Sequence, residues 1–347
     1  MIRTMLVANR VSVGAALVVL ALLVVNLQRW GGIERIHTPW FGVPTASTVA
    51  TASTVALPVT TLPAEGMAWG VYDPAGQFTG ASDLTIEQVY QPWSWAADRG
   101  RAATEAVWGA RVRGRVPLVG VEPWPFVWAG MAEATLLADI VAGAYDVPIR
   151  ETCAALGRQA PQTVLVRWGH EMDLLGRFPW STGNPEEFVG AYRHFVGICR
   201  GTGAANLRYV WSPGGAPDLQ DYWPGAQYVD YVGLTVLGFG ARDVAQGAAR
   251  PHTFGELFGT NYALVQGYGK PVLVCEFAST GPAAHQERWV AEAAEGLAAY
   301  PLLRGVVYFN AVDPVAWGES GVPDWRIAPE AFPPPRPAPL ALVLPAP

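Results

Sequence analysis

The sequence has few of the residues on which several common kinds of site depend. It contains 3 cysteines and none of them forms a C-x-x-C pair, so neither a zinc site nor a disulfide framework is indicated. The 5 histidines are dispersed, and there is no G-x-S-x-G nucleophile motif. Charged residues make up 15% of the chain and the net charge is −6, which argues against a basic face for nucleic acid. We therefore expect no metal, no cofactor and no nucleic-acid partner.

The three cysteines leave one question open. Cys153 and Cys199 fall in two consecutive stretches of predicted helix and can pair only if the compartment is oxidising and the geometry allows it. Cys275 lies in a predicted buried strand.

Tryptophan is abundant, with 15 in the chain. Its large flat ring suits the faces of sugars, although most tryptophans in proteins fill space in the core. The count alone therefore favours a carbohydrate ligand only weakly.

The N-terminus does not read as part of a folded core. Residues 11–25 carry no charge and follow Arg3 and Arg10, which predicts an export signal or anchor within residues 1–30. An uncleaved membrane anchor is favoured over a cleaved signal peptide. We therefore expect a monomer outside the cell or at its surface, held by this segment or secreted if it is cleaved.

Low-complexity segments flank the expected domain. Residues 31–64 contain TASTVA twice in tandem and predict a Thr/Ser/Ala/Pro linker. Residues 332–347 are dominated by proline and predict an extended tail. The folded domain is expected to span residues 65–331.

Within this domain, short β-branched runs alternate with stretches of helical length, which is typical of parallel βα units. The predicted helices cover residues 132–156, with a break near Pro148, and then 185–200, 254–266 and 286–299. Eight strands are predicted, at residues 67–72, 86–93, 116–122, 163–171, 207–212, 228–237, 271–277 and 305–310.

This pattern predicts an α/β protein with a single (β/α)8 TIM barrel, whose site lies at the carboxyl ends of the strands. A doubly wound open sheet is the alternative. It would require a glycine-rich phosphate loop after the first strand, where the sequence reads GVYDPAGQ.

Glutamates stand at the ends of two predicted strands. TVLVRWGHE places Glu171 after the fourth strand, and PVLVCEFA places Glu276 near the end of the seventh. Because side chains alternate along a strand, Arg167, Gly169 and Glu171 are expected on one face. Two carboxyls about 5 to 5.5 Å apart are the geometry of a retaining glycosidase. We predict that Glu276 is the nucleophile, that Glu171 is the proton donor and that Arg167 keeps a neighbouring carboxylate ionised.

Other readings of Glu171 are weaker. By itself it could be a solvated charge at a strand end, but Glu276 in a matching position argues against this. His170 and Glu171 also resemble half of a zinc-binding H-E-x-x-H helix, but residue 174 is leucine and the segment is strand-like.

The stretches VRWGHEMD, YVWSPGG, KPVLVCEFA and VVYFN, in this order, resemble glycoside hydrolase family 26. Members of that family are barrel enzymes with the acid/base after strand four and the nucleophile on strand seven. Most cleave β-1,4-mannan, and some cleave mixed-linkage β-glucan or β-1,3-xylan. The resemblance implies Glu171 as acid/base, Glu276 as nucleophile and His170 as a hydrogen-bonding residue of the active site.

The sequence departs from the family pattern at four positions. Asp173 stands where the family has asparagine, and Arg177 takes the place of a tryptophan. At the end of strand six, Thr235 and Leu237 replace a motif whose tyrosine bonds the nucleophile. The nucleophile is therefore expected to lose one hydrogen bond.

We predict a retaining endo-β-glycanase that hydrolyses β-linked polysaccharide, of β-1,4-mannan or β-glucan type, without a cofactor. The alternative is a catalytically weak or inactive barrel that binds polysaccharide or assists exopolysaccharide assembly or trimming at the cell surface. Trp180 and Trp317 rank highest among the aromatic residues expected at the sugar. The predicted substrate-binding residues are His170, Arg167, Trp180, Phe178, Trp317, Trp124 and Trp93.

Overall fold

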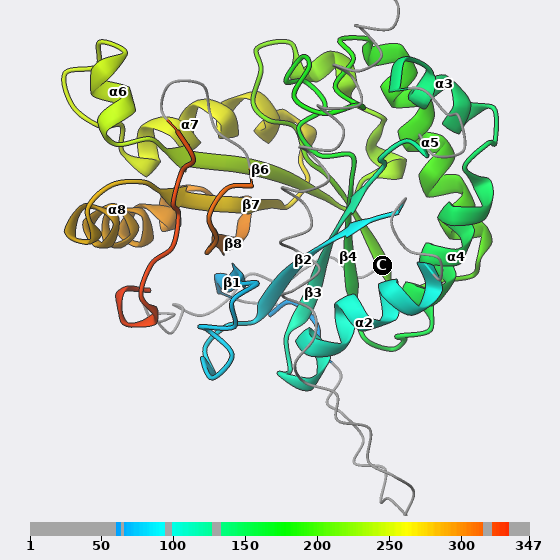
Figure 1. Ribbon diagram of the computed structural model, residues 1–347, viewed down its shortest axis with the longest axis horizontal. Coiled ribbons are helices and arrows are strands. Elements are labelled where there is room, and N and C mark those ends of the chain that lie inside the picture. The colour runs from blue at the N-terminus through cyan, green and yellow to red at the C-terminus, as the bar shows by residue number, and fades with distance from the viewer. Residues whose placement is uncertain (1–59, 64–65, 94–98, 127–132, 315–320, 333–347) are drawn as a thin grey trace, which may run out of the picture. The chain divides into compact units, whose positions relative to one another are not determined.

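The computed structural model describes residues 60–63, 66–93, 99–126, 133–314 and 321–332. Its centre is a closed barrel of eight parallel strands that follow one another in sequence order (Figure 1). Strand β1 pairs with both β2 and β8, which closes the sheet. The predicted barrel is confirmed. The strands are β1 (Ala68–Tyr72), β2 (Ile86–Pro92), β3 (Val116–Glu122), β4 (Val164–Trp168), β5 (Leu207–Trp211), β6 (Tyr231–Gly238), β7 (Val272–Ser279) and β8 (Leu303–Phe309).

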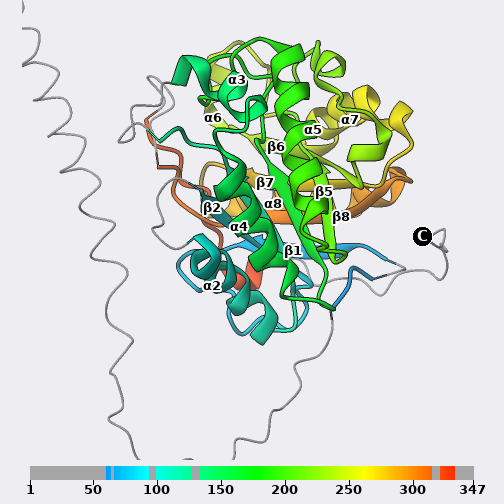
Figure 2. The same ribbon diagram turned by 90° about the vertical axis from the view of Figure 1, so that its right-hand side faces the viewer.

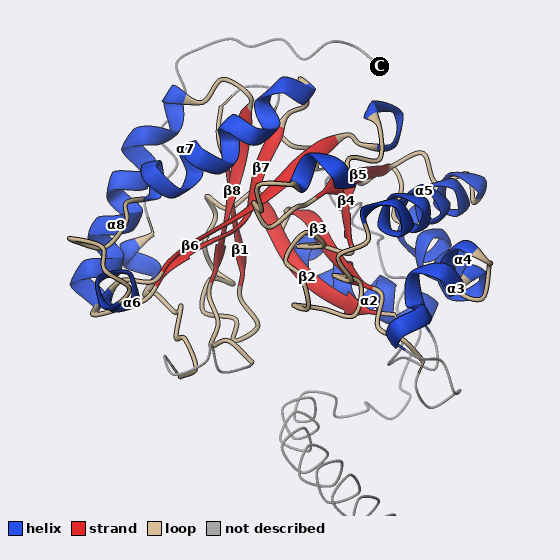
Figure 3. Cartoon of the chain, turned by 90° about the horizontal axis from the view of Figure 1, so that it is seen from above, coloured by secondary structure: helices blue, strands red, loops and turns tan. Residues whose placement is uncertain are grey.

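Helices lie outside the strands. Viewed from above, α3, α4 and α5 lie on one side of the barrel, and α6, α7 and α8 lie on the other (Figure 3). Helices α4 and α5 pack side by side across the outer face of the sheet (Figure 2). The helices are α2 (Arg99–Val112), α3 (Leu136–Val141), α4 (Asp146–Gly157), α5 (Pro185–Gly201), α6 (Ala241–Ala245), α7 (Phe254–Val265) and α8 (Ala283–Gly296). Short 3-10 turns cover Glu133–Thr135, Leu219–Tyr222, Ala226–Tyr228, Gln266–Tyr268, Leu297–Ala299 and Pro329–Ala331.

Helix α5 begins with a side-chain cap, and a disulfide joins it to α4. The side chain of Asn184 accepts a hydrogen bond from the backbone N–H of Glu187, and Pro185 opens α5. Cys153 of α4 and Cys199 of α5 form a disulfide with their Cα atoms 5.1 Å apart, which settles the question that the sequence left open. This bond joins α4, which precedes β4 in the chain, to α5, which follows β4.

Residues just outside the predicted domain limits of 65 and 331 also contact the barrel. The backbone N–H of Thr60 donates to Oε1 of Gln162 at 2.9 Å, and Leu62 packs against the apolar cluster inside the barrel. At the other end, Phe332 is buried with its ring centroid 5.4 Å from that of Trp69. Both segments join the fold because each supplies an apolar side chain that covers the barrel or its outer layer.

The structure also differs from the prediction at three elements. Helix α2 was not predicted, because its buried face is built from small residues such as Ala103 and Ala110. The helix predicted over 132–156 with a break near Pro148 is divided earlier, at Gly143, which has φ +88°, and Pro148 lies in the first turn of α4. Strand β4 ends at Trp168, three residues before Glu171.

Much of the predicted N-terminal organisation lies outside the described residues. This applies to the anchor at 1–30, the linker up to residue 59 and residues 64–65, and the tail after residue 332. In the part of the chain that the structure describes, no helix is long and apolar enough to cross a membrane.

Candidate active site

Glu171 is held by the turn after β4 and does not belong to the strand. Gly169 and Glu171 both adopt positive φ, +57° and +54°, and Glu171 is the only non-glycine residue with positive φ among those described. The turn is fixed because the N–H of Glu171 donates to the carbonyl of Ser212 at 2.7 Å, while its own carbonyl accepts from the Ser181 hydroxyl at 2.9 Å. The expected strand alternation up to residue 171 is therefore wrong. This strained turn aims the carboxyl, a pattern common at functional sites.

Arg167 connects the two glutamates. It is fully buried, and its Nη1 donates to Oε1 of Glu276 at 2.5 Å. Its Nη2 donates to the Thr235 hydroxyl at 3.3 Å, and that hydroxyl donates to Oε1 of Glu171 at 2.8 Å. Its Nε donates to the Ser212 hydroxyl at 2.8 Å. One hydrogen-bond network thus joins the carboxyls that the sequence singles out from strands four and seven.

Glu171 has the electrostatics of a proton donor. Burial and, to a smaller degree, the negative charge of Glu276 raise the pKa of Glu171 from 4.5 to about 7, against the opposing charge of Arg167. Arg177, at the position of the family tryptophan, lies 3.8 Å from Oε2 of Glu171 through its Nε. A carboxyl with this pKa still carries its proton near neutral pH.

Glu276 is surrounded by donors. Besides the ion pair with Arg167, its Oε1 accepts a hydrogen bond at 2.8 Å from the hydroxyl of Tyr90 on β2. Strand β6 offers it no tyrosine, because Thr235 bonds Glu171 and Leu237 lines a neighbouring cleft. The hydrogen bond expected to be missing is therefore present, but it comes from another strand. Two donors on one oxygen form charge-assisted hydrogen bonds that hold the carboxylate in place.

His170 lies beside Glu171 among aromatic rings. Burial, and then the charges of Arg167 and Arg177, lower the pKa of His170 well below its ordinary value, so the imidazole is neutral. Its Nδ1 is buried and has no hydrogen-bond partner among the described residues. A neutral ring with an uncommitted nitrogen can bond a hydroxyl of a bound sugar.

Two predicted sugar platforms are core residues. Trp180 and Trp93 are both 0% exposed. The Trp180 indole donates to the carbonyl of His170 at 2.6 Å and stacks on Phe178 at 4.6 Å, so it supports the turn that carries Glu171. Trp93 donates to the carbonyl of Trp124 at 2.8 Å. Direct stacking of Trp180 or Trp93 on substrate is therefore wrong for this structure, because no face of either ring is accessible.

The remaining aromatic candidates are better exposed or lie elsewhere. Trp124 and Phe178 are partly buried and meet edge to face at 6.5 Å, at the mouth of the barrel. Trp317 lies outside the described residues.

Glu122, the last residue of β3, was missed. The Trp124 indole donates to its Oε2 at 3.1 Å. Burial, and to a smaller degree the charge of Glu276, raise the pKa of Glu122 to about 7. Glu122 ends a strand, the same criterion that identified Glu276, and so could have been found from the sequence.

Asp173, which replaces the family asparagine, organises the loop after β5. Its two carboxyl oxygens accept from the backbone N–H groups of Gly214, Gly215 and Ala216 at 2.5, 3.0 and 2.8 Å. This fixes one wall of the cleft next to Glu171.

That cleft has a volume of about 400 Å³. Its wall combines apolar residues, such as Leu174 and Leu237, with Thr235 and Asn261.

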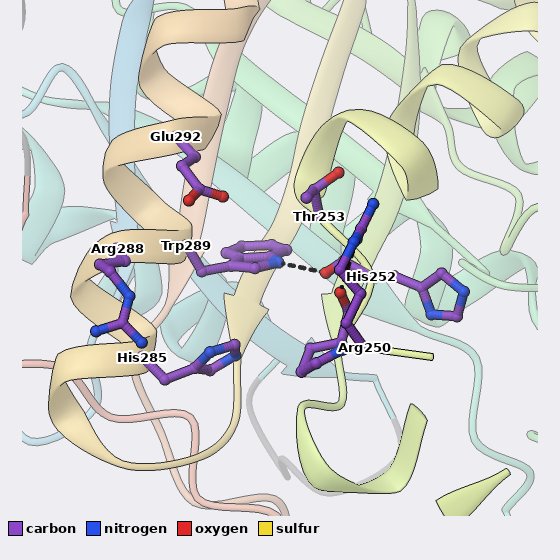
Figure 4. Close-up of a pocket in the computed structure, with 8 residues that line it drawn as sticks. Arg250, His252, Thr253, His285, Arg288, Trp289 and Glu292 are labelled. Carbon is purple, nitrogen blue, oxygen red and sulfur yellow. Dashed lines mark hydrogen bonds between the residues drawn. The ribbon is translucent and has the colours of Figure 1, made fainter. Parts of the chain in front are cut away.

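A second hollow, of about 410 Å³, lies between α8 and the segment before α7 and shares His252 with the cleft (Figure 4). There the Trp289 indole donates to the carbonyl of His252 at 3.0 Å. Glu171 lines only the first, which therefore adjoins the candidate chemistry.

The described residues contain no group of three His, Cys, Asp or Glu side chains that could hold a metal ion. What this site offers is a pair of carboxyls in one network: Glu171, with a pKa of about 7, and Glu276, whose Oε1 accepts hydrogen bonds from Arg167 and Tyr90.

Comparisons with known proteins show what this chain is similar to. Residues 149–250 match the family described as glycosyl hydrolase family 26. Endoglucanase H from Acetivibrio thermocellus is 25% identical over 263 residues, which cover 71% of this chain and 27% of that protein. A β-1,3-xylanase from a Vibrio species is 29% identical over 139 residues, covering 38% of this chain and 29% of its own. The matches thus span less than a third of the length of either relative.

The solved structures show the same fold. A family 26 β-mannanase from Bacteroides ovatus superposes with a TM-score of 0.55 at 16% identity, over 76% of this chain and 85% of that chain. The barrel, the order of its strands and the match over residues 149–250 together make this chain similar to glycoside hydrolase family 26.

Proposed function

We propose that the protein is a retaining endo-β-glycanase that hydrolyses a β-linked polysaccharide of β-1,4-mannan or β-glucan type. One observation carries the proposal: Glu171 and Glu276 share a single network but meet opposite environments in it. Glu171 is buried with a pKa of about 7, whereas Glu276 receives donors from both Arg167 and Tyr90. Paired carboxyls with separated proton affinities are what double displacement requires.

In the first step, a carboxylate oxygen of Glu276 attacks the anomeric carbon of the substrate. Glu171 delivers its proton to the glycosidic oxygen as the bond breaks, so the leaving sugar departs as a neutral alcohol. In the second step, the Glu171 carboxylate takes a proton from water, whose oxygen attacks the same carbon and releases Glu276. Both glutamates return to their starting protonation states, and no cofactor takes part.

The alternative is a barrel that binds polysaccharide but hydrolyses it poorly or not at all. The argument for this alternative is that Leu237 and Arg177 differ from the residues of the family pattern. The hydrogen bond from Tyr90 to Glu276 removes the first of these arguments. Arg177, as a positive charge near Glu171, lowers the pKa of that carboxyl, but burial and Glu276 outweigh it.

We further propose that the domain works outside the cytoplasm, anchored by its N-terminal segment or secreted. The disulfide between Cys153 and Cys199 supports this location, because such bonds persist in oxidising compartments. Protease treatment of intact cells tests it, since an external domain is digested and a cytoplasmic one is protected.

The catalytic proposal is tested with Glu276→Ala and Glu171→Ala. Each variant and the wild type are assayed for release of reducing ends from mannan, mixed-linkage β-glucan and β-1,3-xylan. We expect the wild type to cleave one of these polymers and each variant to lose at least about 1,000-fold in kcat, in line with losses on removing catalytic side chains. Unchanged activity in either variant would refute the assigned roles, and binding without cleavage by the wild type would favour the alternative.

A further inference from the structure

The side chain of Tyr90 bridges two distant parts of the chain. It lies on β2, 186 residues before Glu276, and its hydroxyl donates to Oε1 of Glu276 at 2.8 Å. The amide Nε2 of Gln88 donates to the same hydroxyl at 2.6 Å. Because Gln88 occupies an acceptor position of the phenol oxygen, the tyrosine proton is directed at the carboxylate.

The ring of Tyr90 packs directly against the backbone of Gly120 on the neighbouring strand β3, where a larger residue would clash with it. Tyr90 is in register with Gly120 of β3, and a Cβ added at Gly120 would lie 2.7 Å from Cδ1 of the ring. The opposite edge meets Tyr72, whose ring centroid lies 5.0 Å away at an interplanar angle of 87°. The hydroxyl is thus placed by the packing of three adjacent strands and not by a loop.

Arg167 and Tyr90 act on the same oxygen of Glu276. Nη1 of Arg167 also lies 3.4 Å from the Tyr90 hydroxyl, so the two donors and the acceptor form a closed set of contacts. The other carboxyl oxygen, Oε2, is left out of this set, and it is the oxygen that we assign to the attack on the substrate.

Burial and the charge of Glu276 raise the pKa of Tyr90 well above its ordinary value, so its hydroxyl remains a donor at every working pH. The titratable and charged groups that face or adjoin Glu276 are Tyr72 of β1, Tyr90 of β2, Glu122 of β3, Arg167 of β4, Glu171 after β4 and Cys275 of β7.

We propose that Tyr90 is the positioning residue for the nucleophile: its hydroxyl fixes Oε1 of Glu276, stabilises negative charge there by a hydrogen bond and leaves Oε2 free to react. The proposal rests on the function proposed above. It assigns to β2 the hydrogen bond to Glu276. The end of β6 offers no donor for this bond, because Leu237 lines a cleft and the Thr235 hydroxyl donates to Glu171.

The test compares Tyr90→Phe with Tyr268→Phe in the full chain. Tyr268 is a matched control because it stacks on Trp223 at 4.1 Å in the turn before β7, at the opposite end of that strand from Glu276. Activity is measured on an aryl β-glycoside with a good leaving group, so that proton donation by Glu171 does not limit the rate. We expect Tyr90→Phe to lower kcat by about 10- to 100-fold, the loss expected for one hydrogen bond to a charged group. KM should change little, the acid limb of the pH profile should move to higher pH, and Tyr268→Phe should match the wild type.

A second measurement does not depend on turnover. Glutamate is labelled with 13C at the carboxyl, and the Glu276 signal is identified as the one that is absent in Glu276→Gln. We expect this signal to titrate at higher pH in Tyr90→Phe than in the wild type. Gly120→Ala keeps the hydroxyl but displaces the ring, and should shift the same signal in the same direction.

The two measurements separate the two proposals. If no polymer or aryl glycoside is hydrolysed by the wild type but the Glu276 signal shifts in Tyr90→Phe, the positioning role stands and the hydrolase proposal fails. If the signal titrates identically in Tyr90→Phe and wild type, the positioning role is overturned, whatever the activity.

Discussion

Replacing Glu171 with glutamine should make the protein more stable relative to the wild type as the pH rises. The pKa of Glu171 is about 7, against an ordinary value of 4.5. Below pH 4.5 the carboxyl is protonated in the folded and the unfolded chain alike, so ionisation does not oppose folding. Between pH 4.5 and about 7 the unfolded chain releases the proton first, and the free energy of unfolding therefore falls as pH rises.

The size of this effect follows from the shift in pKa. A change of one in pKa is equivalent to about 1.4 kcal/mol, so the rise in the pKa of Glu171 from 4.5 to about 7 corresponds to about 3 kcal/mol. The variant keeps an oxygen that can accept the Thr235 hydroxyl but has no charge to bury. We expect its stability relative to the wild type to rise by about 3 kcal/mol between pH 4 and pH 8.

Urea unfolding of purified protein, followed by tryptophan fluorescence at both pH values, measures this difference. Glu256→Gln is the control with the opposite sign. The hydrogen bonds from Arg250 and from the backbone of Thr253 lower the pKa of Glu256 to about 2, so its charged form is the favoured one. The relative stability of that variant should not rise with pH. A relative stability of Glu171→Gln that stays constant or falls between pH 4 and pH 8 would refute the assignment of Glu171 as a carboxyl kept protonated by burial.

The remaining predictions concern the same network and its support. The pH profile of kcat/KM should have a basic limb near pH 7, because Glu171 must carry a proton in the first step; a limb above pH 9 would contradict this. Arg167→Met should lower the free energy of unfolding by about 3–5 kcal/mol, since it leaves Glu276 buried without its partner, and the double variant with Glu276→Gln should recover much of that loss. Trp180→Ala should cost about 3–5 kcal/mol in urea unfolding because the ring is fully buried, whereas exposed Trp108→Ala should change stability by less than about 0.5 kcal/mol. Weaker sugar binding by Trp180→Ala at unchanged stability would instead restore its predicted role as a platform.

The barrel itself could be predicted from the sequence because its strands are short apolar runs separated by helical stretches. For the site, the sequence predicted only the residues that lie at recognisable positions within or at the ends of strands. Glu276 lies within β7 and Arg167 lies within β4. The register of β7 shifts beside Glu276, however, so strand alternation selected the right residue but gave the wrong face for its neighbours. Glu122 lay within reach of the same reasoning at the end of β3 and was overlooked.

The rest depends on contacts between strands that are far apart in sequence. The turn at Glu171 is fixed by the carbonyl of Ser212 beyond β5, so strand periodicity gave the wrong geometry even though the residue was chosen correctly. The hydrogen bond from Tyr90 reaches Glu276 across the barrel, and no local pattern announces it. Trp180 shows a third limit, because an aromatic residue in a loop can support the site from beneath or face the substrate, and only packing distinguishes the two.

The central claim is that Glu276 forms a covalent bond with the sugar while Glu171 moves the proton. The most direct test is incubation with an activated 2-deoxy-2-fluoro β-glycoside of the hydrolysed sugar, whose slowed second step allows the intermediate to accumulate. We predict that the protein gains the mass of one fluoroglycosyl group, that the labelled peptide carries it on Glu276, and that Glu276→Gln gains none. A label on another residue, or a hydrolysis product of inverted anomeric configuration, would contradict the claim.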